Sequence, residues 1–147
     1  MEEATIQRLE KSFQLLAPRG PELVDRFYAH MFSKNPVVRE MFPDDMAAQK
    51  KKLLASLVLV IQNLRKAEML RSALIDMGRR HVGYGTEPEH YPIVRDTLLC
   101  VMSEMAGEKW NEQLTEDWKN ALNFVAAVMI EGQKMEQAQP TMQKTAD

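Results

Sequence analysis

Apolar residues recur every three or four positions through most of this chain, and this period limits its fold more than any other feature. Such spacing places the apolar side chains on one face of an α-helix, whereas a half-buried strand requires alternation between apolar and polar residues. No segment of the sequence alternates in that way for long enough to predict a strand. The pattern therefore predicts an all-α protein in which each helix buries one face.

Proline and glycine residues divide this pattern into separate helical segments. Gly20 ends the first apolar stripe, Pro36 opens a short helical turn, and residues 86–89 have the Thr-x-x-Glu form of a helix capping box. We therefore expect seven to eight helices in one domain over residues 1–133. Residues 134–147 are mostly polar and include a proline, which predicts a disordered tail.

Composition and charge exclude several classes of partner. The formal net charge of -2 gives no electrostatic reason to expect nucleic acid or an anionic membrane. The longest apolar run, residues 53–61, is too short to span a bilayer, and the N-terminus does not resemble a signal peptide. The single cysteine, Cys100, lies in an apolar helix pattern and has no partner for an internal disulfide. A reducing cytoplasm is therefore the expected location.

His81 ends an apolar helix stripe and is followed by a turn that contains two glycines. Histidine on an apolar face is more often a satisfied core residue than a ligand. In the same way, Tyr28 can be a buried tyrosine that bonds a backbone carbonyl, and Gln49 can lie at the edge of the core. Taken one at a time, these three residues indicate no function.

Taken together, the same residues fit the requirements of a haem pocket. Haem iron needs an axial imidazole, the porphyrin needs apolar walls, and the opposite side needs one or two hydrogen-bond donors. Gln49 and Leu53 lie one turn apart on the same helix face, and His81 lies on a different helix. The chain has no His-x-x-x-His motif and only one cysteine, so a zinc site is not supported, and it has no P-loop.

Several segments in a fixed order resemble a known family. FYAHMFSKNPVVREMF, then Gln49 with Leu53, then GRRH, PEHYPIV and Trp118, are similar to bacterial globins of the flavohaemoglobin branch and, more distantly, to neuroglobin. The resemblance covers residues 4–133 and implies a globin fold around haem b, iron protoporphyrin IX.

The resemblance also implies a role for each matching residue. His81 corresponds to the proximal histidine that binds the iron, and Phe42 to the phenylalanine that packs against the porphyrin. Tyr28, Gln49 and Leu53 correspond to the distal residues around the ligand, and Tyr28 and Gln49 are the residues expected to take part in any catalysis. The remaining expected haem contacts are Leu57, Tyr91, Val94 and Leu98, with Lys52 either reaching a haem propionate or lying exposed without a partner.

Two departures from the family change what it implies. Gln133 stands where flavohaemoglobins have a glutamate that joins the proximal tyrosine and histidine in a hydrogen-bonded triad. A neutral amide strengthens the histidine less than a carboxylate does, so haem binding is better supported than peroxidase-like or dioxygenase-type catalysis. The chain also stops where a flavohaemoglobin continues into its reductase domain, so turnover is expected to need an external reductase.

Three classes of function stay open. The first is a protein that binds, stores or senses oxygen. The second, which the resemblance implies and with which Tyr28, Gln49 and Leu53 are compatible, is an enzyme that converts nitric oxide and oxygen to nitrate. The third is a haem-free interaction domain, against which His81 and the full set of distal residues argue. Weak ligation of the iron by Gln49 or by His30 in the absence of oxygen stays open, and the sequence carries no signal for an oligomeric state.

Overall fold

The computed structural model describes residues 1–141, and this part of the chain is built from helices with no strand. The helices are α1 (Glu3–Leu16), α2 (Gly20–Lys34), α3 (Ala47–Gln62), α4 (Ala67–Val82), α5 (His90–Ala106) and α6 (Glu112–Ala138), with short 3-10 segments η1 (Ala17–Arg19), η2 (Pro36–Met41) and η3 (Gly107–Lys109). The predicted all-α class is confirmed. The described residues contain six α-helices, fewer than the seven to eight expected.

The difference in number comes from short segments that do not complete an α-helix. Asn35 leaves the helical region with φ -135° and ψ 70°, and Pro36 then begins η2, which ends at the extended residue Phe42. A tight 3-10 turn suits a segment this short, because its hydrogen bonds close after three residues. The helical turn expected after Pro36 is therefore present, but as a 3-10 helix.

The start of α5 also differs from the expected capping box. Thr86 makes no side-chain cap, and the α-helix begins later, at His90. The ring nitrogen Nδ1 of His90 accepts the backbone N–H of Glu87 at 2.9 Å. The capping box would instead have the Thr86 hydroxyl accept the backbone N–H of Glu89, so the donor that is satisfied and the side chain that satisfies it both differ from the expected ones.

The last helix continues past the expected domain boundary at residue 133. α6 ends at Ala138, so residues 134–138 are helical and do not belong to a disordered tail. Glu136 forms an ion pair with Arg79 of α4 at 3.0 Å, and both side chains are mostly buried, which holds this extension against α4. The rest of the expected tail, residues 142–147, lies outside the described residues.

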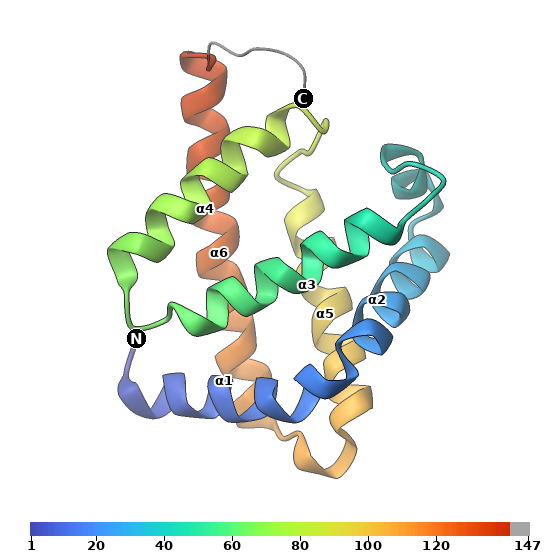
Figure 1. Cartoon of the computed structure of the whole chain (residues 1–147), viewed down its shortest axis with the longest axis vertical. Coiled ribbons are helices and arrows are strands. Elements are labelled where there is room, and N and C mark those ends of the chain that lie inside the picture. Colours follow the sequence, from blue (N-terminus) through green and yellow to red (C-terminus); the bar gives the residue numbers. More distant parts are fainter. Residues whose placement is uncertain (142–147) are drawn as a thin grey trace.

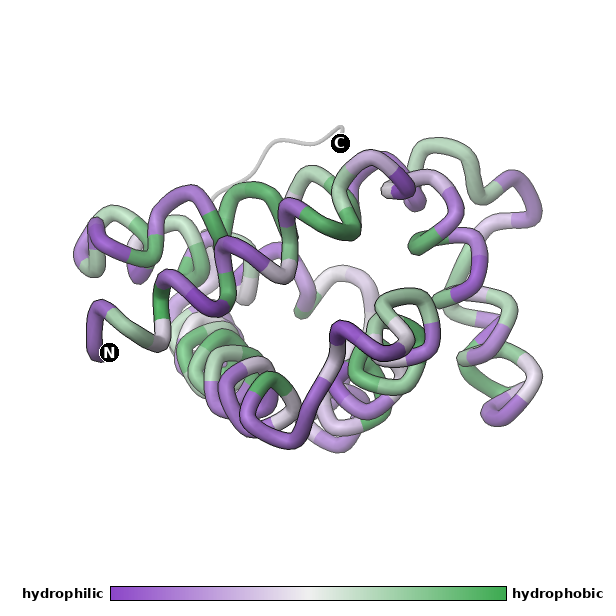
Figure 2. The backbone as a smooth tube through the Cα atoms, turned by 90° about the horizontal axis from the view of Figure 1, so that it is seen from below, coloured by the Kyte–Doolittle hydropathy of each residue, from purple (hydrophilic) through white to green (hydrophobic). Residues whose placement is uncertain are grey.

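The helices cross one another around two apolar clusters. α1 and α3 run across α5 and α6 in Figure 1, while α4 lies beside the C-terminal part of α6. Apolar and hydrophilic residues alternate in patches along each tube in Figure 2, as expected for helices with one buried face. The larger cluster joins α1, α2, α3, α5 and α6, and the smaller one joins α3, α4 and α6. In residues 1–141, no helix is both long and apolar enough to cross a membrane.

Two glycines allow α4 and α6 to approach each other closely. A Cβ atom on Gly78 of α4 would overlap the backbone carbonyl of Met129, and one on Gly132 of α6 would overlap the carbonyl of Ile75. Both glycines are buried. Any larger residue at either position must push the two helix backbones apart, because neither carbonyl can turn aside within its helix.

We expect Gly78→Ala to lower the free energy of unfolding by about 1–3 kcal/mol, because the added methyl group overpacks the contact between α4 and α6. Urea denaturation measures this change. Gly83→Ala is the matched control on the same segment, since its Cβ would lie 3.5 Å from the nearest carbonyl oxygen, an ordinary contact. Equal stabilities for the two variants would show that the close approach of the helices is not needed.

Candidate functional site

Tyr28, Gln49 and Phe42 come together from three different elements. Tyr28 on α2 is buried, with 4% of its surface exposed. The side-chain amide Nε2 of Gln49 on α3 donates to the Tyr28 hydroxyl oxygen at 3.3 Å. The Phe42 ring, just after η2, packs edge-on to the Tyr28 ring with 5.6 Å between centroids. Burial raises the pKa of the Tyr28 phenol, with a smaller lowering by Gln49, so this hydroxyl keeps its proton at neutral pH.

Interactions between α2, η2 and α3 hold this cluster in place. Lys50, next to Gln49, forms an ion pair with Asp25 of α2 at 3.0 Å. Phe32, one turn after Tyr28, packs against Phe42 at 5.4 Å, and the Arg39 guanidinium lies 5.0 Å from the centroid of the Phe32 ring. Phe32 is not among the site residues predicted from the sequence, although its spacing of four from Tyr28 places both rings on one helix face.

The apolar residues predicted at the site differ in how deeply they lie. Leu57 of α3 and Leu98 of α5 belong to the buried part of the larger cluster, at 6% and 2% exposure. Leu53 and Val94 are half-buried and pack onto that cluster, as Phe42 does. Half-buried apolar side chains from α3 and α5 therefore pack on the same apolar cluster that includes Tyr28.

His81 lies in the last turn of α4, where its ring has one hydrogen-bond partner among the described residues. The Nδ1 atom is 2.6 Å from the backbone carbonyl oxygen of Met77, so Nδ1 carries the hydrogen and donates it. Burial lowers the pKa of the ring, and this exceeds the raising effect of the Met77 carbonyl; Arg80 lowers it further. A neutral imidazole results, whose Nε2 lone pair is available to a metal.

Tyr91 and Gln133 form a second polar group beside α4. The Tyr91 hydroxyl donates to Oε1 of Gln133 at 2.8 Å, and Nε2 of Gln133 donates to the backbone carbonyl of Thr86 at 2.7 Å. Gln133 is 3% exposed. Burial raises the pKa of the Tyr91 phenol to about 12. No hydrogen bond between His81 and either Tyr91 or Gln133 occurs in the described residues.

Within residues 1–141, Lys52 makes no hydrogen bond or ion pair with the other predicted site residues. Its side chain is exposed and forms no ion pair within residues 1–141. The sequence does not predict that the backbone carbonyls of Met77 and Thr86 accept hydrogen bonds from His81 and Gln133. Every residue has a backbone carbonyl, so the pattern of side chains cannot indicate which carbonyl is used.

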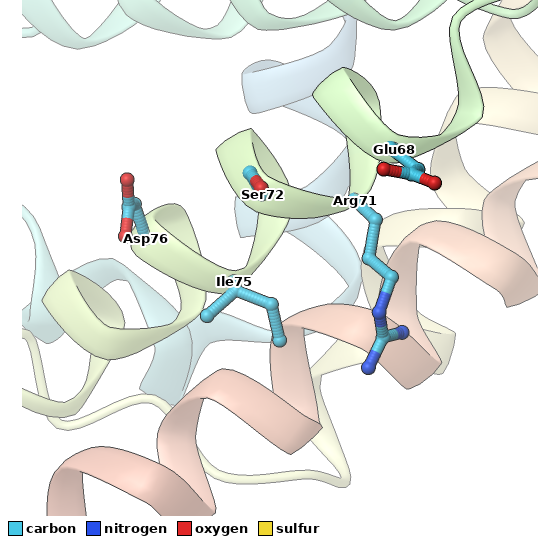
Figure 3. A pocket seen from close by; sticks show the side chains of 5 residues that line it. All are labelled: Glu68, Arg71, Ser72, Ile75 and Asp76. Carbon is cyan, nitrogen blue, oxygen red and sulfur yellow. The ribbon is translucent and has the colours of Figure 1, made fainter.

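Two surface hollows lie apart from these residues. One hollow, of about 640 Å³, lies along α4, where the Arg71 side chain extends toward α6 (Figure 3). Arg71 forms an ion pair with Glu131 of α6. This hollow is lined by Glu68, Arg71, Ser72, Ile75 and Asp76. The other, of about 390 Å³, lies between α2 and α5 and is lined by His30, Lys34, Asn35, Ile93, Asp96, Thr97 and Cys100. Neither hollow includes a residue that the sequence assigned to haem contact. Within residues 1–141, no group of three or more His, Cys, Asp or Glu side chains is placed to hold a metal ion.

Comparisons with known proteins agree on one family. A sequence model of the family described as Globin matches residues 25–129. The chain is 31% identical over 140 residues to a protein of Aquifex aeolicus described as an uncharacterized globin-like protein, covering 95% of this chain and 99% of that one. It is 30% identical over 131 residues to a flavohemoprotein of Vibrio cholerae, covering 86% of this chain but only 33% of the length of that protein. A solved bacterial globin from Campylobacter jejuni superposes with a TM-score of 0.83 at 26% identity, covering 94% of this chain and all of that one.

The buried phenol of Tyr91 gives a pH-dependent prediction. Its pKa is raised from 10.0 to about 12, so the folded state keeps the proton after the unfolded chain has lost it. This contribution to stability is complete below pH 10 and is lost as the pH rises through about 12. In a spectrophotometric titration, Tyr91→Phe should lack one late-ionising phenol that wild type shows, while Tyr28, whose pKa burial also raises, is present in both proteins. Tyr84→Phe, which removes an exposed hydroxyl, should keep the late step of Tyr91.

Proposed function

Because this chain belongs to the globin family, we propose that it binds haem b, iron protoporphyrin IX, and reversibly binds oxygen and other diatomic ligands such as nitric oxide. The observation that carries this proposal is the neutral His81 imidazole, whose Nδ1 is bonded to the Met77 carbonyl and whose Nε2 is left for iron. In this assignment His81 is the only protein ligand of the metal.

The donor set of the site fits haem. One neutral imidazole nitrogen is what an axial position requires, and half-buried apolar side chains suit the faces of a porphyrin. We assign the porphyrin contacts to Tyr28, Phe42, Gln49, Leu53, Leu57, His81, Tyr91, Val94 and Leu98, and a propionate contact to Lys52. The exposed Lys52 amine is suited to that role because its flexible stem can reach a carboxylate at the protein surface.

Haem held by His81 would supply a ferrous iron able to bind a diatomic ligand. The Tyr28 hydroxyl then acts as a hydrogen-bond donor to that ligand. Because the Gln49 amide already donates to the Tyr28 oxygen, the hydroxyl hydrogen is the part of the group left for a second partner. Leu53 and Phe42 exclude loose water from the same space. Oxygen is therefore expected to bind tightly and to leave slowly.

The proximal side favours binding over bond cleavage. The His81 ring N–H donates to a backbone carbonyl, which is a weaker acceptor than a carboxylate. Gln133 is a neutral amide whose oxygen accepts from Tyr91 and whose nitrogen donates to Thr86. The imidazole accordingly gains little negative character, which suits reversible ligand binding.

A second candidate is nitric oxide dioxygenation with electrons from a separate reductase. It is supported by the identity to a flavohemoprotein and by the Tyr28–Gln49 donor pair. A cytoplasmic location would suit this function, since the free thiol of Cys100 belongs in a reducing compartment. The two candidates separate by steady turnover: sustained nitrate formation with a cellular reductase favours the enzyme, and its absence leaves the binding role.

The first test is the visible absorption spectrum of the purified protein, ferric and then reduced with dithionite. Wild type should carry haem, and His81→Ala should lose haem or change its ferrous spectrum, because the axial nitrogen is gone. His30→Ala is the matched control and should resemble wild type, since His30 lines a separate hollow. A wild-type protein that stays colourless after haem is added would refute the proposed cofactor.

Tyr28→Phe tests the proposed donor on the ligand side. A hydrogen bond to a charged group contributes about 1.5–3 kcal/mol, so oxygen should dissociate roughly ten to a hundred times faster from this variant. Stopped-flow displacement of oxygen by carbon monoxide measures the rate. Tyr84→Phe, at an exposed ring, is the control. An unchanged rate in Tyr28→Phe would remove the hydroxyl from the mechanism.

A further inference from the structure

The turn that follows His81 forms few backbone hydrogen bonds to the rest of the protein. Residues 83–89 connect α4 to α5 and include Gly85, whose φ of +76° lies in the left-handed region, and Tyr84, which is 53% exposed. The backbone hydrogen bonds of this turn are local, and two of them, from the N–H groups of Tyr84 and Thr86, end on the carbonyl of His81 at 3.1 and 3.2 Å. The position of the turn and the last turn of α4 are thus linked.

Gln133 supplies a long-range hydrogen bond to this turn. Its Nε2 donates to the backbone carbonyl of Thr86, and the backbone N–H of Thr86 donates to the carbonyl of His81. Two hydrogen bonds, both made by the backbone of Thr86, therefore connect the buried Gln133 amide on α6 to the backbone of His81. Gln133 also follows directly on Gly132, whose close approach to α4 fixes the spacing of the two helices.

The two partners of Gln133 require a side chain that both donates and accepts hydrogen bonds, as an amide does. The Thr86 carbonyl can only accept a hydrogen bond, so the side chain facing it must donate. The Tyr91 hydroxyl donates from the other side, so the same side chain must also accept. A carboxylate meets the second requirement and fails the first, because it has no hydrogen to give. An apolar side chain fails both.

We propose that Gln133 is a positioning residue that anchors the Thr86 peptide to α6 and so fixes the last turn of α4 and the direction of the His81 ring. This inference rests on the proposed function only where it concerns iron; the anchoring of the turn stands on the hydrogen bonds alone. The same amide also orients Tyr91, because its oxygen accepts the hydrogen bond from the Tyr91 hydroxyl.

Hydrogen exchange at single backbone amides, followed by NMR on the full chain as purified, tests the anchor. In Gln133→Met and Gln133→Glu at neutral pH, the amides of Tyr84 and Thr86 should exchange roughly ten times faster or more than in wild type, because the Thr86 carbonyl has lost its donor. Gln137→Met, an exposed glutamine one turn along α6, should match wild type. Tyr91→Phe should have a much smaller effect, since it leaves the bond to Thr86 intact.

The iron–histidine stretching band in the resonance Raman spectrum of the ferrous protein gives the second readout. The band should shift or broaden in Gln133→Met and stay unchanged in Gln137→Met. Because this band reports the bond between His81 and the iron, a general loss of stability would not produce such a shift. Wild-type exchange rates in Gln133→Met or Gln133→Glu, or equal loss in Tyr91→Phe, overturn the inference. A wild-type protein that takes up no haem overturns the proposed function instead, and the exchange result still decides the role of Gln133.

Discussion

The close contact of α4 and α6 is the constraint on which the proximal half of the site depends. Gly78 lies three residues before His81, and Gly132 lies one residue before Gln133, so one helix crossing sets the position of both side chains of the proposed site. The missing Cβ atoms allow backbone to meet backbone, which leaves little freedom for the helices to slide. Gln133 can then reach across to Thr86 with a hydrogen bond of 2.7 Å.

The other half of the site is built by different forces. Tyr28, Phe42 and Gln49 are held by aromatic packing and by the docking of α3 on α2, and they belong to the larger apolar cluster or lie against it. Tyr91 packs on the smaller cluster with residues of α4 and α6. The two halves therefore rest mainly on different clusters, which are connected through α3, α6 and the half-buried Leu64.

The sequence predicts the parts of this structure that depend on repeated apolar contacts. The period of three to four residues indicates helices throughout, and the same spacing places Gln49 and Leu53 on one face. The sequence does not indicate that His90 accepts the backbone N–H of Glu87, because the partner of this N–H depends on the conformation of the folded turn. Nor does it reveal the partners of Gln133, which are joined only when α6 has docked on α4.

Burial keeps the polar groups of the site uncharged, and this limits the chemistry that they can perform. It raises the pKa values of Tyr28 and Tyr91 and lowers that of His81, so both phenols keep their protons and the imidazole stays neutral near pH 7. Gln49 and Gln133 carry no charge at any pH. Within residues 1–141, none of these five residues forms an ion pair. Such groups act by donating and accepting hydrogen bonds in fixed directions, with no proton to exchange at neutral pH. A site of this kind is suited to holding a small ligand and releasing it unchanged.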